Sequence, residues 1–159
     1  ILSSVENYIP QTDDIFTCAL GNPISKKKYI ELILAKGGNF INLIHKSAII
    51  LGTSKIGNGC IIFQNVSISA DVCVGDYVTL QPMVFLGHDS KIGNWSHLNT
   101  NCICNGFSEV GELSTIHTSA IIAPQKKVGN NSVVGAGSFV TRNVMDNSTV
   151  FGNPAKKLL

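Results

Sequence analysis

The sequence of 159 residues has few charges, few aromatic side chains and no long hydrophobic run. Charged residues make up 14% of the chain, and the formal net charge is +2. This balance provides neither a basic groove nor an acidic tail, so we expect no nucleic-acid partner. The only run of three basic residues is Lys26, Lys27 and Lys28, which we interpret as the solvated start of a helix rather than a nucleic-acid contact.

The chain also lacks the features of a membrane or exported protein. Its longest purely apolar stretches are a few residues, whereas a helix needs roughly 20 to cross a bilayer. No signal peptide opens the sequence. We therefore expect no membrane insertion and a cytoplasmic location. The first residue is Ile1 rather than methionine, which is compatible with a fragment of a longer protein.

An aliphatic residue returns at every sixth position over most of the chain. The seventeen positions from 44 to 140 hold Ile, Leu or Val, except for Cys104, which is itself small and apolar. A fixed period of this kind is typical of a solenoid. Short strands with alternating faces and a small residue at each bend fit a three-sided coil of three hexapeptides, with coils about 4.8 Å apart. The sequence therefore predicts a mostly β protein, a parallel β-helix of almost six coils.

The five cysteines indicate neither a disulfide framework nor a metal site. Their number is odd, and Cys60, Cys102 and Cys104 fall on positions that the repeat uses for small interior side chains. We predict buried free thiols. No second pair accompanies Cys102 and Cys104 at metal-ligand spacing, so no metal is expected.

The first 42 residues do not carry the period. We predict a short strand at 15–20 and a helix at 23–36, with Asn22 as its cap and Gly37 in its stop. Strand, loop and helix of this kind are typical of an α/β layer and cannot bury their apolar face alone. The chain is thus divided into a partial small α/β domain at 1–42 and a β-helix with a C-terminal tail at 43–159.

The outward positions of the coils form ladders of different chemistry. One is mostly charged and should face solvent: Lys55, Cys73, Lys91, Glu109 and Lys127. Two others are apolar: Ile49, Ser67, Phe85, Ile103, Ile121 and Phe139, and then Tyr77, Trp95 and Leu113. A monomer would leave both apolar stripes exposed to solvent, and contiguous exposed apolar surface usually marks an interface. We predict a homo-oligomer, for which a cyclic homotrimer suits a three-sided prism.

The hexapeptide pattern resembles the left-handed β-helix acyltransferase superfamily, whose hand departs from the usual right-handed crossover. Three motifs narrow the resemblance: residues 43–48, residues 87–93 with Ser96 and His97, and residues 152–156. With these the chain is similar to the sugar O- and N-acetyltransferases related to sialic acid O-acetyltransferases and to the bacillosamine-pathway N-acetyltransferase. The resemblance implies a left-handed β-helix and acetyl-CoA as co-substrate.

His88 is the candidate general base, because an imidazole titrates near neutrality and can accept a proton from an attacking amine or hydroxyl. Its neighbours one coil away are Ala70 and Gly106, which leave room for a substrate. From spacing alone, a surface histidine with accidental neighbours is the alternative. The resemblance implies that Asp89 orients the imidazole, which requires a bend at His88 because neighbours on a strand point to opposite faces. An ordinary solvated aspartate is the alternative for Asp89.

His97 lies half a coil past His88, so these two side chains should lie on different sides of one prism. The resemblance implies that His97 contacts acetyl-CoA, and a polar edge residue is the alternative. If both histidines serve one site, a neighbouring subunit must supply one of them. We assign no catalytic role to His45 or His117.

Thr118 and Ala136 match family positions that contact the coenzyme, and with Thr100 they form a ladder along the prism axis. Small side chains there would let the pantetheine arm approach the backbone, although such a stripe is also normal at the bends of a β-helix. Acyl transfer would be direct, with the backbone N–H of Gly106 stabilising the oxyanion.

The resemblance also implies which residues bind the acceptor. In the family a small α/β domain binds a nucleotide-sugar, and the first 42 residues look like its later part. Gly21 matches the Gly-Asn loop of that domain, and Gln81 stands where relatives often have an Asn near the acceptor, so both are predicted to bind the acceptor sugar. The Gly-rich turn after the first strand of that domain is missing.

We first interpret the function as acetyl-CoA-dependent N-acetylation of the amino group of a nucleotide-linked amino sugar. O-acetylation of a sialic acid or another sugar is the second interpretation, and a non-catalytic β-helix with a binding or structural role is the third. Serine O-acetyltransferases are disfavoured because their helical N-terminal domain has no counterpart. A carbonic anhydrase is disfavoured because the spacing of His88, His97 and His117 does not suit a zinc site.

Overall fold

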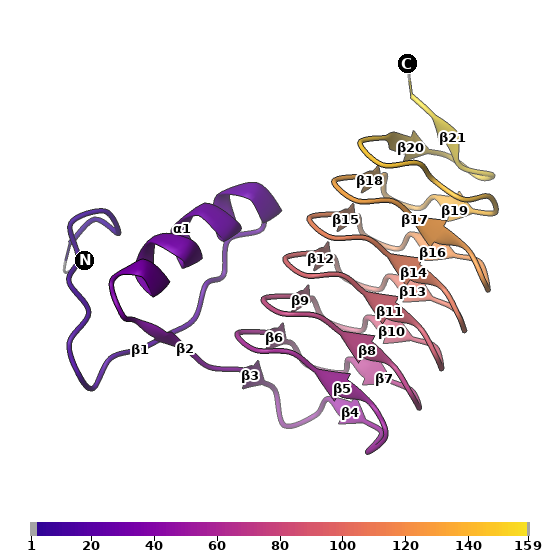
Figure 1. Ribbon diagram of the computed structural model, residues 1–159. Helices are drawn as coiled ribbons and strands as arrows, with labels where there is room; N and C mark the ends of the chain where they lie inside the picture. The colour runs from indigo at the N-terminus through magenta and orange to yellow at the C-terminus, as the bar shows by residue number, and fades with distance from the viewer. Residues whose placement is uncertain (1–2, 159) are drawn as a thin grey trace.

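The computed structural model describes residues 3–158, which form a parallel β-helix with one helix packed against its side (Figure 1). The chain winds into stacked coils, and each complete coil adds one short strand to each of three sheets. The mostly β architecture with about six coils, predicted from the sixfold period, is confirmed.

Three sheets form the sides of the prism. The six-stranded sheet contains β4 (Ile49–Ile50), β7 (Ser67–Ile68), β10 (Phe85–Leu86), β13 (Ile103–Cys104), β16 (Ile121–Ile122) and β19 (Phe139–Val140). The five-stranded sheet contains β5 (Lys55–Ile56), β8 (Cys73–Val74), β11 (Lys91–Ile92), β14 (Glu109–Val110) and β17 (Lys127–Val128). The eight-stranded sheet contains β3 (Leu43–Ile44), β6 (Ile61–Ile62), β9 (Thr79–Leu80), β12 (His97–Leu98), β15 (Thr115–Ile116), β18 (Val133–Val134), β20 (Thr149–Phe151) and β21 (Lys156–Lys157). Strands of successive coils pair in parallel, as Phe85 does with Ile103, while β20 and β21 pair antiparallel.

The aliphatic ladder fills the interior of the prism. Its members from Ile62 to Val140 are at most 5% exposed. Ile44 is 43% exposed, because it lies on the first coil and has a neighbouring coil on one side only. Burying each such side chain contributes roughly 1.5 to 3 kcal/mol before entropy is subtracted, so the stacked interior holds the narrow prism together.

The interior cysteines are free thiols, as predicted. Cys60, Cys102 and Cys104 are fully buried and form no disulfide. Burial raises the pKa of the Cys102 thiol to about 12 and also raises the pKa of Cys60 and Cys104. Because the thiolate is the reactive form, these three cysteines are poor nucleophiles.

The corners of the prism are built on left-handed backbone. A positive φ recurs at every sixth position from Gly59 to Gly137. Turns of this kind favour Gly, Asn and Asp, which occupy many of these corners. Bulky side chains stand in the same conformation at five corners: Tyr77, Met83, Trp95, Phe107 and Leu113.

The N-terminal segment consists of β1 (Ile15–Phe16), α1 (Pro23–Ala35) and β2 (Asn39–Phe40), with β1 and β2 parallel. The helix starts as predicted, because the Ser25 N–H donates to Oδ1 of Asn22 at 2.9 Å. The predicted strand at 15–20 is too long, since only its first two residues pair with β2. The helix is too short to span a bilayer, and residues 3–158 contain no other.

The N-terminal segment packs against the prism and covers part of one predicted apolar stripe. Ile30, Ile33 and Phe40 are buried there, and Tyr77 and Trp95 pack against them. The Tyr77 and Trp95 rings stack with centroids 4.4 Å apart. The prediction that a monomer would expose these two aromatic residues to solvent is therefore wrong, because the N-terminal segment of the same chain covers them.

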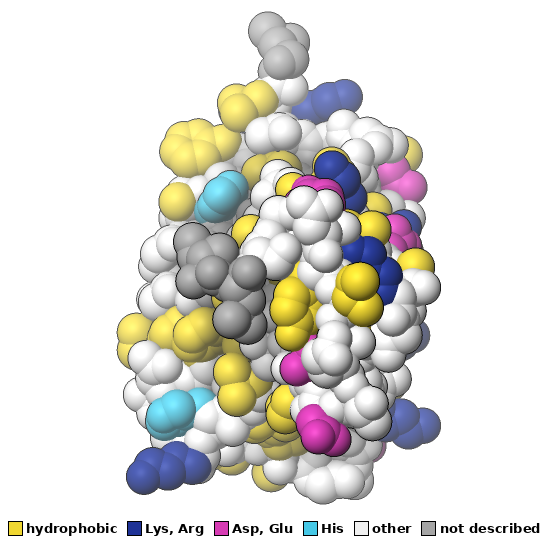
Figure 2. Space-filling model, turned by 90° about the vertical axis from the view of Figure 1, so that its left-hand side faces the viewer, with side chains coloured by type: hydrophobic (Ala, Val, Ile, Leu, Met, Phe, Trp, Pro, Cys, Tyr) yellow, Lys and Arg dark blue, Asp and Glu magenta, His cyan; other side chains and the backbone are white. Residues whose placement is uncertain are grey.

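The other outer faces differ in character. On the five-stranded sheet, Glu109 lies 2.8 Å from Lys127 and 3.9 Å from Lys91, so this face is charged and solvated as predicted. On the six-stranded sheet, Ile49 and Phe85 remain 63% and 41% exposed. Figure 2 views the side that carries the N-terminal segment, where hydrophobic side chains lie among charged ones.

Candidate active site

His88 lies on the corner between β10 and β11, which we call the His88 corner. Its Nδ1 lies 2.9 Å from Oδ2 of Asp89, and both side chains are substantially exposed. The contact between two sequence neighbours is possible because Asp89 adopts a φ of 57°, which bends the chain as the predicted pairing requires.

Gly106 lies on the next coil, directly beside the His88 ring. A Cβ at Gly106 would lie 2.7 Å from Nε2 and 2.9 Å from Cε1 of His88, so the missing side chain makes room for the imidazole. Within residues 3–158 the Gly106 N–H has no hydrogen-bond acceptor. This donor is therefore free to bind an oxygen that develops negative charge.

A shallow cavity of about 480 Å³ opens at the His88 corner. Its lining includes His88, Gly106, Phe107 and Phe85, which also belongs to the apolar face of the six-stranded sheet. Two larger hollows, of about 790 Å³ each, lie on the N-terminal segment and along the five-stranded sheet. Neither is lined by a predicted site residue, so the cavity beside His88 is the candidate active site.

His97 lies elsewhere, on β12 beneath the N-terminal segment. It is only 4% exposed. A Cβ at Gly21 would lie 3.7 Å from Cε1 of His97, and Nδ1 has no hydrogen-bond partner within residues 3–158. Burial lowers the pKa of His97 to about 4, with the charges of Lys26 and His117 adding to the effect. The imidazole is therefore neutral at physiological pH.

Lys26 is also buried here, so its interpretation as part of a solvated helix start is wrong. It is 1% exposed, and Nζ donates to Oγ1 of Thr79 and to the carbonyl of Ser96, each at 3.3 Å. Burial lowers the pKa of Lys26 to about 8. These two acceptors flank His97, because Ser96 precedes it and Thr79 pairs with it across the sheet.

Thr100, Thr118 and Ala136 stack along the corner between the eight-stranded and six-stranded sheets. The Ser119 N–H donates to Thr100 O at 3.0 Å, and the Gly137 N–H donates to Thr118 O at 2.9 Å. Thr118 and Ala136 are exposed, and their own N–H groups have no acceptor within the described part of the chain. This ladder therefore offers a row of backbone donors to an extended ligand.

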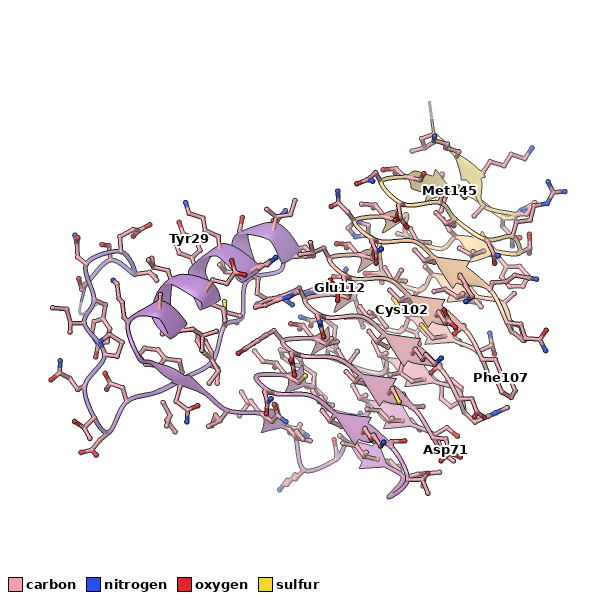
Figure 3. All side chains as sticks on the ribbon, viewed as in Figure 1. Tyr29, Asp71, Cys102, Phe107, Glu112 and Met145 are labelled. Carbon is pink, nitrogen blue, oxygen red and sulfur yellow. The ribbon has the colours of Figure 1, made fainter. Side chains whose placement is uncertain are left out.

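The structure brings some predicted residues together and separates others. His88, Asp89 and Gly106 form one group, and Gly21 with His97 forms another. Asp71 and Phe107 share the corner of His88, because all three lie between a strand of the six-stranded sheet and the next strand of the five-stranded sheet. Figure 3 shows Asp71 and Phe107 away from α1, whereas Glu112 lies nearer to it. Gln81 is half-buried at the start of the corner that leads from β9 to β10, rather than at the His88 corner. One chain thus does not assemble all predicted residues into one site.

Two residues near these groups were not predicted from the sequence. Phe107 contacts His88, and Lys26 lies beside His97. Phe107 could have been singled out from the sequence, because it is a bulky residue that follows Gly106 at a corner position that favours small residues. Nothing in the sequence distinguished Lys26 as a buried residue, since it is one of three consecutive lysines. No cluster of three or more His, Cys, Asp or Glu suited to a metal ion occurs in residues 3–158.

Comparison with known proteins finds similar acetyltransferases, both by sequence and by structure. No protein-family model matches the chain. The chain is 27% identical over 143 residues to a GDP-perosamine N-acetyltransferase of Escherichia coli O157:H7, covering 90% of the chain and 57% of that relative. It therefore spans less than two thirds of that protein's length.

Solved structures agree over most of the chain. The crystal structure of PerB from Caulobacter crescentus, in complex with CoA and GDP-perosamine, is 27% identical with a TM-score of 0.90, covering 92% of this chain and 70% of that one. The acetyltransferase domain of PglB from Neisseria gonorrhoeae, in complex with acetyl coenzyme A, is 30% identical with a TM-score of 0.86, covering 89% and 69%.

Proposed function

Because the chain belongs to the hexapeptide-repeat, left-handed β-helix acetyltransferases, we propose that it transfers the acetyl group of acetyl-CoA to the amino group of a nucleotide-linked amino sugar. The observation that carries this proposal is the exposed His88 and Asp89 pair beside Gly106, in a cavity at a corner of the prism. The relatives named for N-acetylation of perosamine and the structures with bound CoA support the substrate classes.

In the proposed mechanism His88 acts as general base. Its Nδ1–H donates to Asp89, which leaves Nε2 to take a proton from the attacking amine. The nitrogen forms a bond to the thioester carbonyl carbon, and the Gly106 N–H stabilises the oxyanion. The C–S bond then breaks, the sulfur leaves as the thiol of CoA with the proton from His88, and the sugar keeps the new amide.

The ladder of Thr118 and Ala136 is the proposed binding site for the pantetheine arm. Its free backbone N–H groups match the amide carbonyls of pantetheine, and the small side chains permit close approach. His97 is proposed as a further acetyl-CoA contact.

The acceptor is proposed to bind through the N-terminal segment. We propose residues 1–42 as the later part of a nucleotide-sugar-binding domain, with Gly21 in its loop and Gln81 nearer the acceptor sugar. GDP-perosamine bound to PerB supports a nucleotide-linked acceptor.

We further propose a homotrimer that works in the cytoplasm on glycan precursors. The half-exposed apolar face of the six-stranded sheet supports the oligomer, because such surface usually marks an interface. Phe85 belongs both to this face and to the lining of the His88 cavity, so a neighbouring subunit docked there would border the site.

The proposal is tested by incubating the protein with acetyl-CoA and a panel of nucleotide-linked amino sugars, sialic acids and serine, followed by mass spectrometry. We expect an acetamido product from an amino sugar, and activity of His88→Ala reduced by roughly 100-fold or more. O-acetylated products would favour the sugar O-acetyltransferase interpretation. Absence of turnover together with absence of thermal stabilisation by acetyl-CoA would favour a non-catalytic β-helix.

A further inference from the structure

Phe107 contacts the candidate base through both its ring and its backbone. The Phe107 ring meets the His88 imidazole in a T-shaped arrangement, with centroids 5.1 Å apart and planes at 86°. The Phe107 N–H donates to the carbonyl oxygen of His88 at 2.9 Å. The side chain nevertheless stays at the surface, because Phe107 is 50% exposed.

Phe107 also adopts an unfavourable backbone conformation. Its φ is 59°, in the left-handed region that disfavours bulky side chains. Tyr77 and Trp95 share this conformation, but packing against the N-terminal segment accounts for them. Phe107 belongs to neither buried core cluster, and within residues 3–158 the His88 imidazole is the only ring that its own ring meets. Because this backbone recurs at the corners of the prism, including that at Met83, what distinguishes Phe107 is the contact of its exposed ring with His88.

The contact restricts the His88 imidazole. Asp89 binds Nδ1, while the Nε2 and Cε1 edge of the ring lies against Gly106, in the space that a side chain there would fill. The Phe107 ring occupies part of the remaining space around the imidazole. A base held in one orientation reacts faster than one that samples several.

We propose that Phe107 is a positioning residue for His88, which holds the imidazole over Gly106 with Nε2 directed into the cavity. This inference rests on the proposed function for the identity of the reaction. The contact itself is open to test in the substrate-free protein.

The kinetic test compares Phe107→Gly with Phe107→Tyr. Phe107→Gly removes the ring and suits the left-handed backbone, so we expect kcat to fall about tenfold or more, with KM for acetyl-CoA little changed and no decrease in Tm. Phe107→Tyr keeps the ring and should retain most of the activity. The matched control is Asn131→Gly, because Asn131 is also exposed with a φ of 51° but lies on the corner between the five-stranded and eight-stranded sheets, so it should leave kcat unchanged.

A second measurement is independent of turnover. Nitrogen-15 NMR of the imidazoles, with the His88 signals assigned from His88→Ala, should show one dominant tautomer in the wild type and a mixture or broadened signals in Phe107→Gly. Unchanged kcat, an unchanged His88 spectrum or dissociation of the oligomer in Phe107→Gly would each overturn the proposal, the last because it would make Phe107 an interface residue. If the wild type acetylates no amino sugar, the proposed function fails while the NMR comparison still decides the role of Phe107.

Discussion

Asp89 is held against His88 by one hydrogen bond, and its charge is what should matter to the reaction. Asp89→Asn keeps the shape and tolerates the left-handed backbone, but it removes the negative charge that stabilises the imidazolium formed on proton transfer. We expect kcat to fall by roughly one to two orders of magnitude with KM for acetyl-CoA little changed. Steady-state kinetics with both substrates varied measures this.

The matched control is Asp71→Asn, because Asp71 occupies the same corner position one coil earlier, with a φ of 58°. Although Asp71 lies one coil from Asp89, within residues 3–158 its carboxylate makes no hydrogen bond or ion pair with His88, so kcat should be unchanged. Equal losses in the two variants would show that the corner backbone, rather than the contact with His88, causes the effect.

The variant Gly106→Ala tests whether the reaction depends on the position of the His88 imidazole over Gly106. In Gly106→Ala the new Cβ would lie 2.7 Å from Nε2, so the exposed ring must swing away from the cavity. Since a flexible side chain can move at little cost, we expect Tm to change by only a few degrees while kcat falls roughly 100-fold. Gly52→Ala is the control, because a Cβ there meets nothing within 4 Å. Wild-type kcat in Gly106→Ala would show that the position of His88 is not critical.

The residues of the His88 corner could be predicted from the sequence, but the contacts that hold the His88 imidazole could not. The period placed Gly106 one coil from His88, because the parallel register repeats with each coil. The left-handed conformation at Asp89 completed the predicted bend. The contact with Phe107 depends on side-chain orientation at a corner, which a repeat does not specify.

At the scale of elements, the docking of α1 onto β12 makes stability depend on pH. The folded protein holds His97 at a pKa of about 4, against 6.5 for a histidine in an unfolded chain. Between these values the unfolded chain binds more protons, so the free energy of unfolding falls as pH drops from about 6.5 to about 4. The shift corresponds to a loss of about 3 kcal/mol.

Denaturant unfolding of the wild type and of His97→Gln at several pH values between 4 and 7 measures this effect. His97→Gln should remove most of the dependence in that window. His45→Gln is the control, because His45 is exposed and is not among the groups that shift the pKa of His97, so the dependence should stay in place. A wild-type stability that stays constant from pH 6.5 to 4 would contradict the buried placement of His97.

The β-helix could be predicted from the sequence because each coil contacts only its neighbours, so one repeating pattern is sufficient to define it. The helix was predicted too, from Asn22 and Pro23. Its place on the prism could not be, because the period shows which side chains point outward and not what covers them. Lys26, Tyr77 and Trp95 were misjudged for this reason.

At the scale of the whole molecule, one chain keeps the proposed base apart from the proposed acceptor residues. Gly21 lies against His97 on the eight-stranded sheet, whereas His88 lies on the corner between the other two sheets. The apolar face of the six-stranded sheet reaches this corner through Phe85. A neighbouring subunit on that face would place a second chain beside His88, which is how the proposed trimer would complete the site.

Shared sites make a specific prediction for mixed assemblies. His88→Ala and His97→Gln should each be poorly active alone, but co-expressed chains carrying different tags would form trimers in which some interfaces pair an intact His88 with an intact His97. In a cyclic trimer that contains both variants, one of the three interfaces pairs an intact His88 with an intact His97, so purified mixed trimers should recover about one third of wild-type activity. Sedimentation confirms the trimer, and unmixed variants give the baseline. Mixed trimers no more active than the average of their parents would show that the two histidines do not meet across subunits.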